Sequence, residues 1–184
     1  PMAWLKSWLP ARSASAAAST TFESHYAAHE VLGSGSFATV YRCVEKEDGG
    51  VYAVKVIRMG SLSRVERDNL DEEVSLLRRC NHEAIVHLKE TFFAPGPPED
   101  LLNVVTEIIR GGDLFDELVA TDYDAGPYDE SHARTMVGEV LDAVEYLHER
   151  GVVHRDIKPE NIMLCRPPGH GDPNEPWARV KLVD

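Results

Sequence analysis

Cysteine, basic residues and long apolar runs are all scarce in this sequence. The three cysteines, Cys43, Cys80 and Cys165, lie far apart and form no Cys-x-x-Cys pair, so neither a disulfide framework nor a zinc site is indicated. No apolar run reaches the roughly 18 residues that a membrane helix requires, and the tryptophan-containing start is too interrupted for a secretory signal. We therefore expect a soluble chain in a reducing compartment, the cytoplasm.

The charge balance restricts the classes of partner. Nineteen Lys and Arg residues stand against 31 Asp and Glu residues, which gives a formal net charge of −12. Nucleic acids and anionic membranes attract basic surfaces, so we expect neither as a partner. A protein or peptide substrate with basic residues fits this charge better.

Residues 1–22 have the composition of a linker. They carry Lys6 and Arg12 but no acid, and residues 12–21 are almost only Ala, Ser and Thr. Such composition cannot bury enough apolar surface to fold, so we predict a disordered leader. An organellar transit segment, which is also basic and rich in serine, is the alternative.

Residues 23–109 predict a small sheet with one helix. Apolar and polar residues alternate over 26–57, with turn signals at Gly33-Ser34-Gly35 and Asp48-Gly49-Gly50, which is typical of three antiparallel strands. Two further strands are predicted at 85–88 and 101–109, on either side of a proline-rich turn.

The predicted helix of this region follows the third strand. Ser63 and Glu66 have the spacing of a capping box. Leu70, Val74 and Leu77 then recur at helical spacing up to about Arg79. The expectation is a five-stranded antiparallel sheet with one helix.

From residue 110 the pattern becomes mainly helical. A short helix is predicted at 114–119, and Gly151 is a predicted C-cap of a longer one. The apolar face of that longer helix is marked by Ala133, Met136, Val137, Val140, Val144 and Leu147. Short strands are predicted at 152–153, 162–164 and 180–183, with an inserted loop at 166–176. The fold class is α+β, with a β-rich lobe over 23–109 and a partial helical lobe over 110–184.

A glycine pattern lies in the first predicted turn. Gly33 to Val40 occupies a strand-turn-strand setting, whereas a dinucleotide fold would place its glycines between a strand and a helix. Glycines at 33 and 35 let the backbone approach phosphate oxygens, with N–H groups free to donate. For this motif alone, an ordinary hairpin turn is an equal alternative.

A lysine follows on the third strand. Ala53 and Lys55 are two residues apart and therefore face the same side of the sheet. A small residue beside a lysine leaves room for a flat base whose phosphates the ammonium can reach. Glu73 borders the buried stripe of the next helix and is the predicted partner of Lys55. A solvated surface lysine is the alternative.

The most specific segment runs from His154 to Asn161, with the sequence His-Arg-Asp-Ile-Lys-Pro-Glu-Asn. Asp156 can accept a hydroxyl proton, and Lys158 can offset phosphate charge. Asn161 offers an oxygen to a hard cation. We expect His154 to be a packed structural histidine. Asp184, at the end of an apolar strand, is placed where a second magnesium ligand would belong.

Taken together, residues 26–184 resemble the eukaryotic protein kinase family of the serine/threonine type. The resemblance implies ATP and Mg²⁺ as cofactors, Asp156 and Lys158 as catalytic residues, and Asn161 and Asp184 as metal ligands. It also implies a hinge at 107–109 and Thr106 as the residue that gates the rear pocket. The implied cofactor-binding residues are Leu32, Gly33, Ser34, Gly35, Ser36, Phe37, Ala38, Thr39, Val40, Ala53, Lys55, Glu73, Glu107, Ile109, Asn161 and Asp184.

Finer features are similar to the calcium/calmodulin-dependent kinase group. They are Gly111 to Phe115, His82 before Ile85-Val86, and the loop after Leu164. In that group Asp113 and Glu160 would face basic substrate residues, although two solvated surface acids are an equal alternative. Calmodulin binding is implied only through sequence beyond Asp184.

The pattern departs from the family at two places. Ala38 replaces the third glycine of the loop, and the Phe-Gly, activation segment and Ala-Pro-Glu anchor expected after Asp184 are absent from the sequence. A working kinase represented by a fragment is the favoured hypothesis. The five polar residues that the family requires are present, namely Lys55, Glu73, Asp156, Asn161 and Asp184. An inactive pseudokinase that binds nucleotide or acts as a scaffold, and a truncated inactive product, remain open. For the 184-residue chain alone we expect little turnover.

Overall fold

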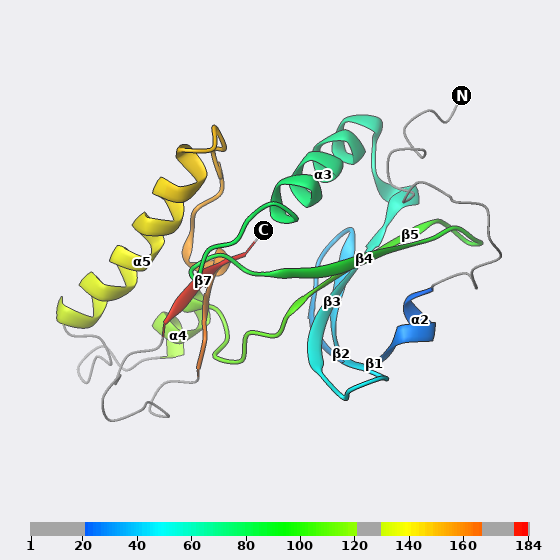
Figure 1. Cartoon of the computed structure of the whole chain (residues 1–184), viewed down its shortest axis with the longest axis horizontal. Helices are drawn as coiled ribbons and strands as arrows, with labels where there is room; N and C mark the ends of the chain where they lie inside the picture. The colour runs from blue at the N-terminus through cyan, green and yellow to red at the C-terminus, as the bar shows by residue number, and fades with distance from the viewer. Residues whose placement is uncertain (1–20, 121–129, 167–178, 184) are drawn as a thin grey trace.

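The computed structural model describes residues 21–120, 130–166 and 179–183. Figure 1 shows two parts side by side, a β-sheet with one long helix over it and a smaller group of helices with a strand pair. The first part contains α2 (Phe22–His25), β1 (Tyr26–Ser34), β2 (Ala38–Glu45), β3 (Val51–Arg58), the 3-10 turn η1 (Met59–Ser61), α3 (Arg64–Leu77), β4 (Leu88–Ala94) and β5 (Leu101–Glu107). The second contains α4 (Leu114–Ala120), α5 (Glu130–His148), η2 (Pro159–Asn161), β6 (Ile162–Leu164) and β7 (Val180–Leu182).

The sheet has five antiparallel strands in the order β1-β2-β3-β5-β4, so the predicted fold class is confirmed. The Asp48-Gly49-Gly50 turn also forms, with Gly49 in the left-handed region at φ 77°, where a side chain would be strained. Phe22, at the predicted end of the leader, is already buried in α2.

The capping box of α3 forms as predicted. The Glu66 N–H donates to Ser63 Oγ at 3.3 Å, and the Ser63 N–H donates to Glu66 Oε2 at 2.8 Å. Val74 of α3 then packs on one face of the sheet with Ile57, Leu102 and Val104. This cluster fixes the helix against β3, the strand that carries Lys55.

The fourth strand was predicted at the wrong place. Ile85 makes only an isolated parallel bridge with Leu182, and β4 begins at Leu88. Ile85 and Val86 are buried, so their apolar character reflects packing against the second part of the molecule. The strand instead includes Phe92, which lies on the opposite, outer face of the sheet with Phe22 and Tyr26. The predicted strand 101–109 ends at Glu107.

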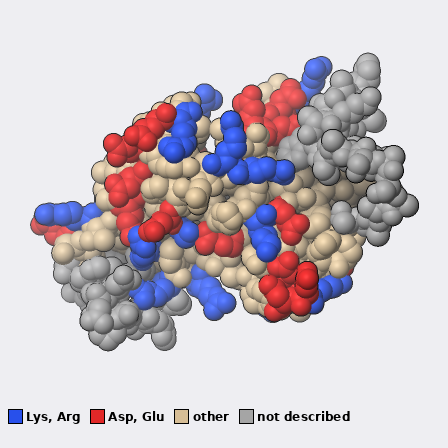
Figure 2. Space-filling view, in the orientation of Figure 1, with Lys and Arg blue, Asp and Glu red and all other residues tan. Residues whose placement is uncertain are grey.

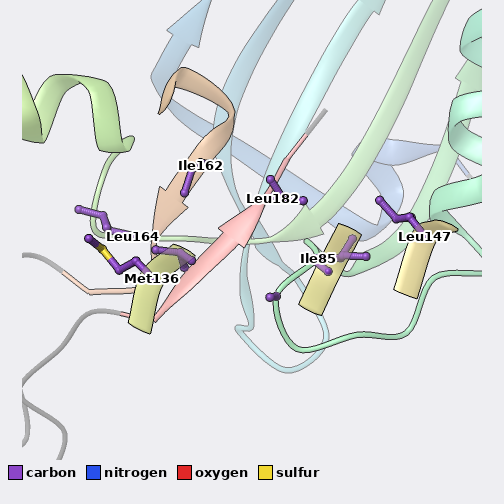
Figure 3. Close-up of a cluster of buried hydrophobic side chains, with 9 residues drawn as sticks. Ile85, Met136, Leu147, Ile162, Leu164 and Leu182 are labelled. Carbon is purple, nitrogen blue, oxygen red and sulfur yellow. The ribbon is translucent and has the colours of Figure 1, made fainter. Parts of the chain in front are cut away.

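A separate core holds the second part together (Figure 3). Met136, Ala143 and Leu147 of α5 pack with Leu164 and Leu182 of the small strand pair and with Ile85. The predicted apolar face of this helix was too wide, because Val137 is 56% exposed.

After α5, the structure confirms the predicted C-cap but not the predicted strand that follows it. Gly151 follows α5 with φ 73° and is the predicted C-cap. The predicted strand at 152–153 does not form, and Val153 is 61% exposed. Most of the predicted loop at 166–176 lies outside the described residues.

Two segments join the parts. The Leu182 N–H donates to Ala84 O at 2.9 Å, and the Val86 N–H donates to Leu182 O at 2.9 Å. Beyond the hinge, the Gly111 N–H donates to Leu164 O and the Leu164 N–H to Gly112 O, both at 2.8 Å. None of the helices among the described residues has the length and apolar character needed to span a bilayer.

Candidate active site

The glycine-rich turn joins β1 to β2, and its backbone is held by Arg58 at the end of β3. Arg58 Nη2 donates to Ser36 O at 2.7 Å, and the Arg58 N–H donates to Phe37 O at 3.0 Å. Because C=O and N–H point in opposite directions across a trans peptide, the Phe37 N–H points away from Arg58. That amide is therefore a candidate donor to a bound phosphate.

The glycines themselves fit the prediction only in part. A Cβ at Gly33 would meet no atom within 4 Å, so the turn is open on that side. The Gly35 N–H, predicted to be free, donates to Ala38 O at 2.8 Å inside the turn. The hydrogen bond within the turn therefore satisfies the Gly35 N–H, and a glycine pattern alone cannot predict this bond.

Lys55 lies on the face of β3 that α3 covers. It is opposite Val40 of β2 and Val104 of β5 in the strand register, and Val104 belongs to the cluster beneath α3. Ala53, opposite Thr106, shares that face, as predicted from the two-residue spacing. Lys55 is half-buried.

Glu73 lies on α3 next to the buried Val74, and its side chain is exposed. It was expected to point inward from the border of the apolar stripe. Its ion pair with Lys55 stays a prediction, supported by the packing of α3 against the face that carries the lysine.

The predicted hinge, residues 107–109, lies at the end of β5. Glu107 is the last strand residue, and its N–H donates to His87 O at 3.0 Å. Its Oε1 accepts from the His87 N–H at 2.8 Å and from Lys181 Nζ at 2.7 Å. The strand ends here, so the backbone of residues 108 and 109 has left the sheet ladder, as a hinge that contacts a base requires.

The loop before β6 brings three predicted residues together. Asn161 Nδ2 donates to Asp156 Oδ2 at 2.8 Å and to Asp156 O at 2.9 Å. Lys158 Nζ lies 2.9 Å from the same Oδ2 atom. These contacts fix the carboxylate of Asp156 between an amide and an ammonium group.

The electrostatics of this loop favour an ionised aspartate. The ammonium of Lys158, and then the amide of Asn161, hold the pKa of Asp156 below its ordinary value. Arg155 adopts φ 67°, a left-handed conformation that costs free energy in a non-glycine residue and is concentrated at functional sites. His154 is half-buried, and its Nδ1 accepts from the Asp156 N–H at 3.4 Å, as a structural histidine would.

The residues of the loop fit a divalent cation. Asn161 is buried and uses Nδ2 for both of its contacts with Asp156, so Oδ1 is the oxygen it can offer to a hard ion. The Val183 N–H donates to Asn161 O at 3.0 Å, one residue before Asp184. Asp184 itself, the other predicted metal ligand, lies outside the described residues. Among the side chains that the structure describes, no group of three or more His, Cys, Asp or Glu could hold a metal ion.

Comparison with known families agrees with this arrangement. A family model described as "Protein kinase domain" matches residues 26–184. The chain belongs to the protein kinase family. The match begins at Tyr26, the first residue of β1, and includes every described element from β1 to β7.

Curated relatives identify the group within the family. Calcium/calmodulin-dependent protein kinase type IV of Mus musculus is 40% identical over 153 residues, which cover 83% of this chain and 29% of that protein. Myosin light chain kinase A of Dictyostelium discoideum is 39% identical over 151 residues, 82% of this chain and 48% of that protein. Calcium/calmodulin-dependent protein kinase type 1 of Caenorhabditis elegans is 38% identical over 148 residues, 80% of this chain and 40% of that protein.

These relatives confirm the predicted resemblance to serine/threonine kinases of the calcium/calmodulin-dependent group. The chain spans less than half the length of each of the three.

The two acids predicted to face a substrate lie in different settings within this kinase domain. Asp113 Oδ1 accepts from the Asp116 N–H at 2.8 Å, so one oxygen caps the start of α4. Glu160 lies in η2 and is exposed. Helix α4 contacts η2, so Asp113 lies near the loop over 154–161 that contains Glu160.

Two residues that contact the candidate site were not singled out in the sequence. Arg58 directly follows the apolar run of β3, and Lys181 stands inside the short apolar strand β7. A cation interrupting a buried strand implies a buried partner, and this was the available signal for Lys181. Nothing in the sequence pointed from Arg58 to the glycine-rich turn.

One cavity of about 400 Å³ contains no residue of this site. It lies where α5, residues 81–84 and Arg179 meet. Arg179 pairs there with Glu83 at 2.8 Å and with Glu139 at 3.1 Å. These ion pairs join the residue before β7 to the 81–84 segment and to α5.

Proposed function

We propose that the protein catalyses transfer of the γ-phosphoryl group of ATP, with Mg²⁺, to serine and threonine hydroxyls of protein substrates. The observation that carries this proposal is the geometry of Asp156, whose Oδ2 lies 2.8 Å from the Asn161 amide and 2.9 Å from the Lys158 ammonium. A carboxylate fixed between these groups can accept a hydroxyl proton beside a metal ligand and a phosphate-binding cation.

Each residue has a defined task in this reaction. Asp156 orients the substrate hydroxyl and accepts its proton, and its lowered pKa keeps the acceptor ionised to a lower pH than an ordinary aspartate. Lys158 offsets charge on the transferred group, and Asn161 Oδ1 holds a cation. Lys55 holds the phosphates from the sheet. Mg²⁺ and ATP, when bound, supply the electrophilic phosphoryl group and neutralise its charge.

The proposed substrates are proteins with basic residues near the acceptor hydroxyl. Glu160 is exposed in η2 within the 154–161 loop, and Asp113 caps the start of α4, which contacts η2. The chain carries a formal net charge of −12. We further propose calmodulin as a regulator of the whole protein and the cytoplasm as its location. The proposal of calmodulin as a regulator rests on the names of the relatives.

Phosphotransfer by active-site variants of the whole protein tests the proposal. Wild type should phosphorylate an arginine-containing serine peptide, with phosphoserine as the product. Asp156→Asn should lower kcat by roughly 10²- to 10⁴-fold because the proton acceptor is lost, and Lys55→Met should abolish measurable turnover. Asp142→Asn, on the exposed side of α5, is the matched control and should leave the rate unchanged. Undiminished activity in either active-site variant would contradict the assignment.

A further inference from the structure

One ion pair links the hinge directly to the strand β7. Lys181 Nζ donates to Glu107 Oε1 at 2.7 Å. The side chains are only 18% and 33% exposed, respectively. Among the ion pairs of the described residues this one combines a short distance with a largely buried cation, a state that costs free energy unless the charge is paired.

The hinge carboxylate is held from two directions. The same Oε1 atom of Glu107 accepts from the His87 N–H at 2.8 Å, while the Glu107 N–H donates to His87 O at 3.0 Å. His87 belongs to the segment that pairs with β7 through Ala84 and Val86. Glu107, the 84–87 segment and β7 thus form a closed loop of contacts, and Lys181 completes it.

Both residues of the ion pair, Lys181 and Glu107, are connected to the proposed nucleotide site. Glu107 is the first residue of the predicted hinge, 107–109, whose backbone is predicted to contact adenine. Lys181 lies in β7, and two residues later the Val183 N–H donates to Asn161 O at 3.0 Å. The Lys181–Glu107 pair therefore connects the adenine side of the site with the strand that leads to its metal side.

We propose that Lys181 is a positioning residue for nucleotide binding, acting through the Glu107 carboxylate to hold the hinge in register with β7. The proposal rests on the proposed function, since it assigns the adenine to this hinge. Lys181 does not touch the nucleotide, so it affects affinity through geometry. Small displacements of positioning groups have large effects on binding and rate.

The experiment compares four single variants of the full chain by two measurements. The first is the affinity for a fluorescent ATP analogue, measured without turnover, and the second is amide hydrogen exchange in the peptide over 104–111. Lys181→Met removes the ammonium, Lys181→Arg keeps the charge, and Glu107→Gln keeps an acceptor for the His87 N–H but not the ion pair. Arg179→Met, which breaks the ion pairs of Arg179 with Glu83 and Glu139 two residues earlier on the same segment, is the control for general loss of stability.

Lys181→Met and Glu107→Gln should each weaken analogue binding about tenfold and speed exchange of the hinge peptide. A double variant that combines Lys181→Met with Glu107→Gln should bind the analogue no more weakly than either single variant, because the two changes remove the same ion pair. Lys181→Arg should stay within about threefold of wild type, and Arg179→Met should bind normally.

Normal analogue binding by a folded Lys181→Met variant would overturn the proposal, as would equal losses in Lys181→Met and Arg179→Met. A whole protein, as used in the phosphotransfer test, that binds the analogue tightly but transfers no phosphoryl group contradicts the proposed function alone. In that case the variant series still decides the role of Lys181.

Discussion

At the scale of single residues, Asp156 shows how two neighbours set the chemistry of a third. Lys158 contributes most to its lowered pKa, and Asn161 contributes next. Asp156 is exposed, so these contacts act mainly on which protonation state prevails and on where the carboxylate points. They contribute little to the stability of the fold.

Removing Lys158 should change the pH dependence of the reaction. A folded-state pKa below the ordinary value keeps Asp156 ionised as pH falls. Lys158→Met should therefore raise this pKa and move the acid limb of the kcat/KM profile to higher pH. The Asp156 carboxyl carbon, followed by NMR titration, should show the same shift. Lys158→Arg is the control and should preserve the limb. An acid limb in Lys158→Met at the wild-type pH would contradict the role assigned to this pair.

Not every residue of the site was equally visible in the sequence. Asp156, Lys158 and Asn161 fall within six residues, so local spacing alone brought them together correctly. The Gly35 N–H is engaged by the exact conformation of its turn, and the contacts of Arg58 and Lys181 join segments far apart in the chain. Only tertiary structure determines such contacts.

At the scale of elements, the linker after the hinge depends on a close backbone approach. A Cβ at Gly111 would lie 2.6 Å from Leu164 Cβ and still closer to the carbonyl oxygens of Leu164 and Arg166. Backbone atoms cannot yield as a flexible side chain can, so the pairing of this linker with β6 requires glycine. A Cβ at Gly138, inside α5, would instead meet no atom within 4 Å.

Alanine at these two glycines should have opposite effects on the free energy of unfolding. Gly111→Ala should lower it by about 1–3 kcal/mol because β6 must shift. Gly138→Ala should raise it by roughly 0.5–1 kcal/mol because alanine loses less conformational freedom in a helix. Chemical denaturation of the variants checks both signs. Gly96→Ala, in open space, is the neutral control, and a harmless Gly111→Ala would show that the close approach is not required.

Elements with strong local signals were predicted well, and those shaped by neighbours were not. The capping box of α3 and the C-cap Gly151 fixed two helix ends within a few residues. The run from Ile85 was taken for a strand because it is apolar, yet its burial comes from contact with β7. Periodicity cannot separate a buried strand from a buried connection.

At the scale of the whole molecule, acidic and basic side chains lie interspersed over the face shown in Figure 2. The two parts meet through the 84–86 segment with β7 and through residues 111–112 with Leu164, and the residues of the candidate site come from both parts. Each part supplies residues to it, since Lys55 lies on the sheet and Asp156 on the loop beside β6. The sequence order of these motifs made this division predictable, while the contacts that join the two parts were not.

Magnesium-dependent binding of ATP by the 184-residue chain tests the central claim most directly. The account predicts saturable binding that weakens when Mg²⁺ is chelated and when Asn161→Ala removes a cation ligand. Lys55→Met should also weaken binding, and Asp142→Asn should not. A chain that is folded by circular dichroism yet binds no ATP, with or without Mg²⁺, would contradict the account.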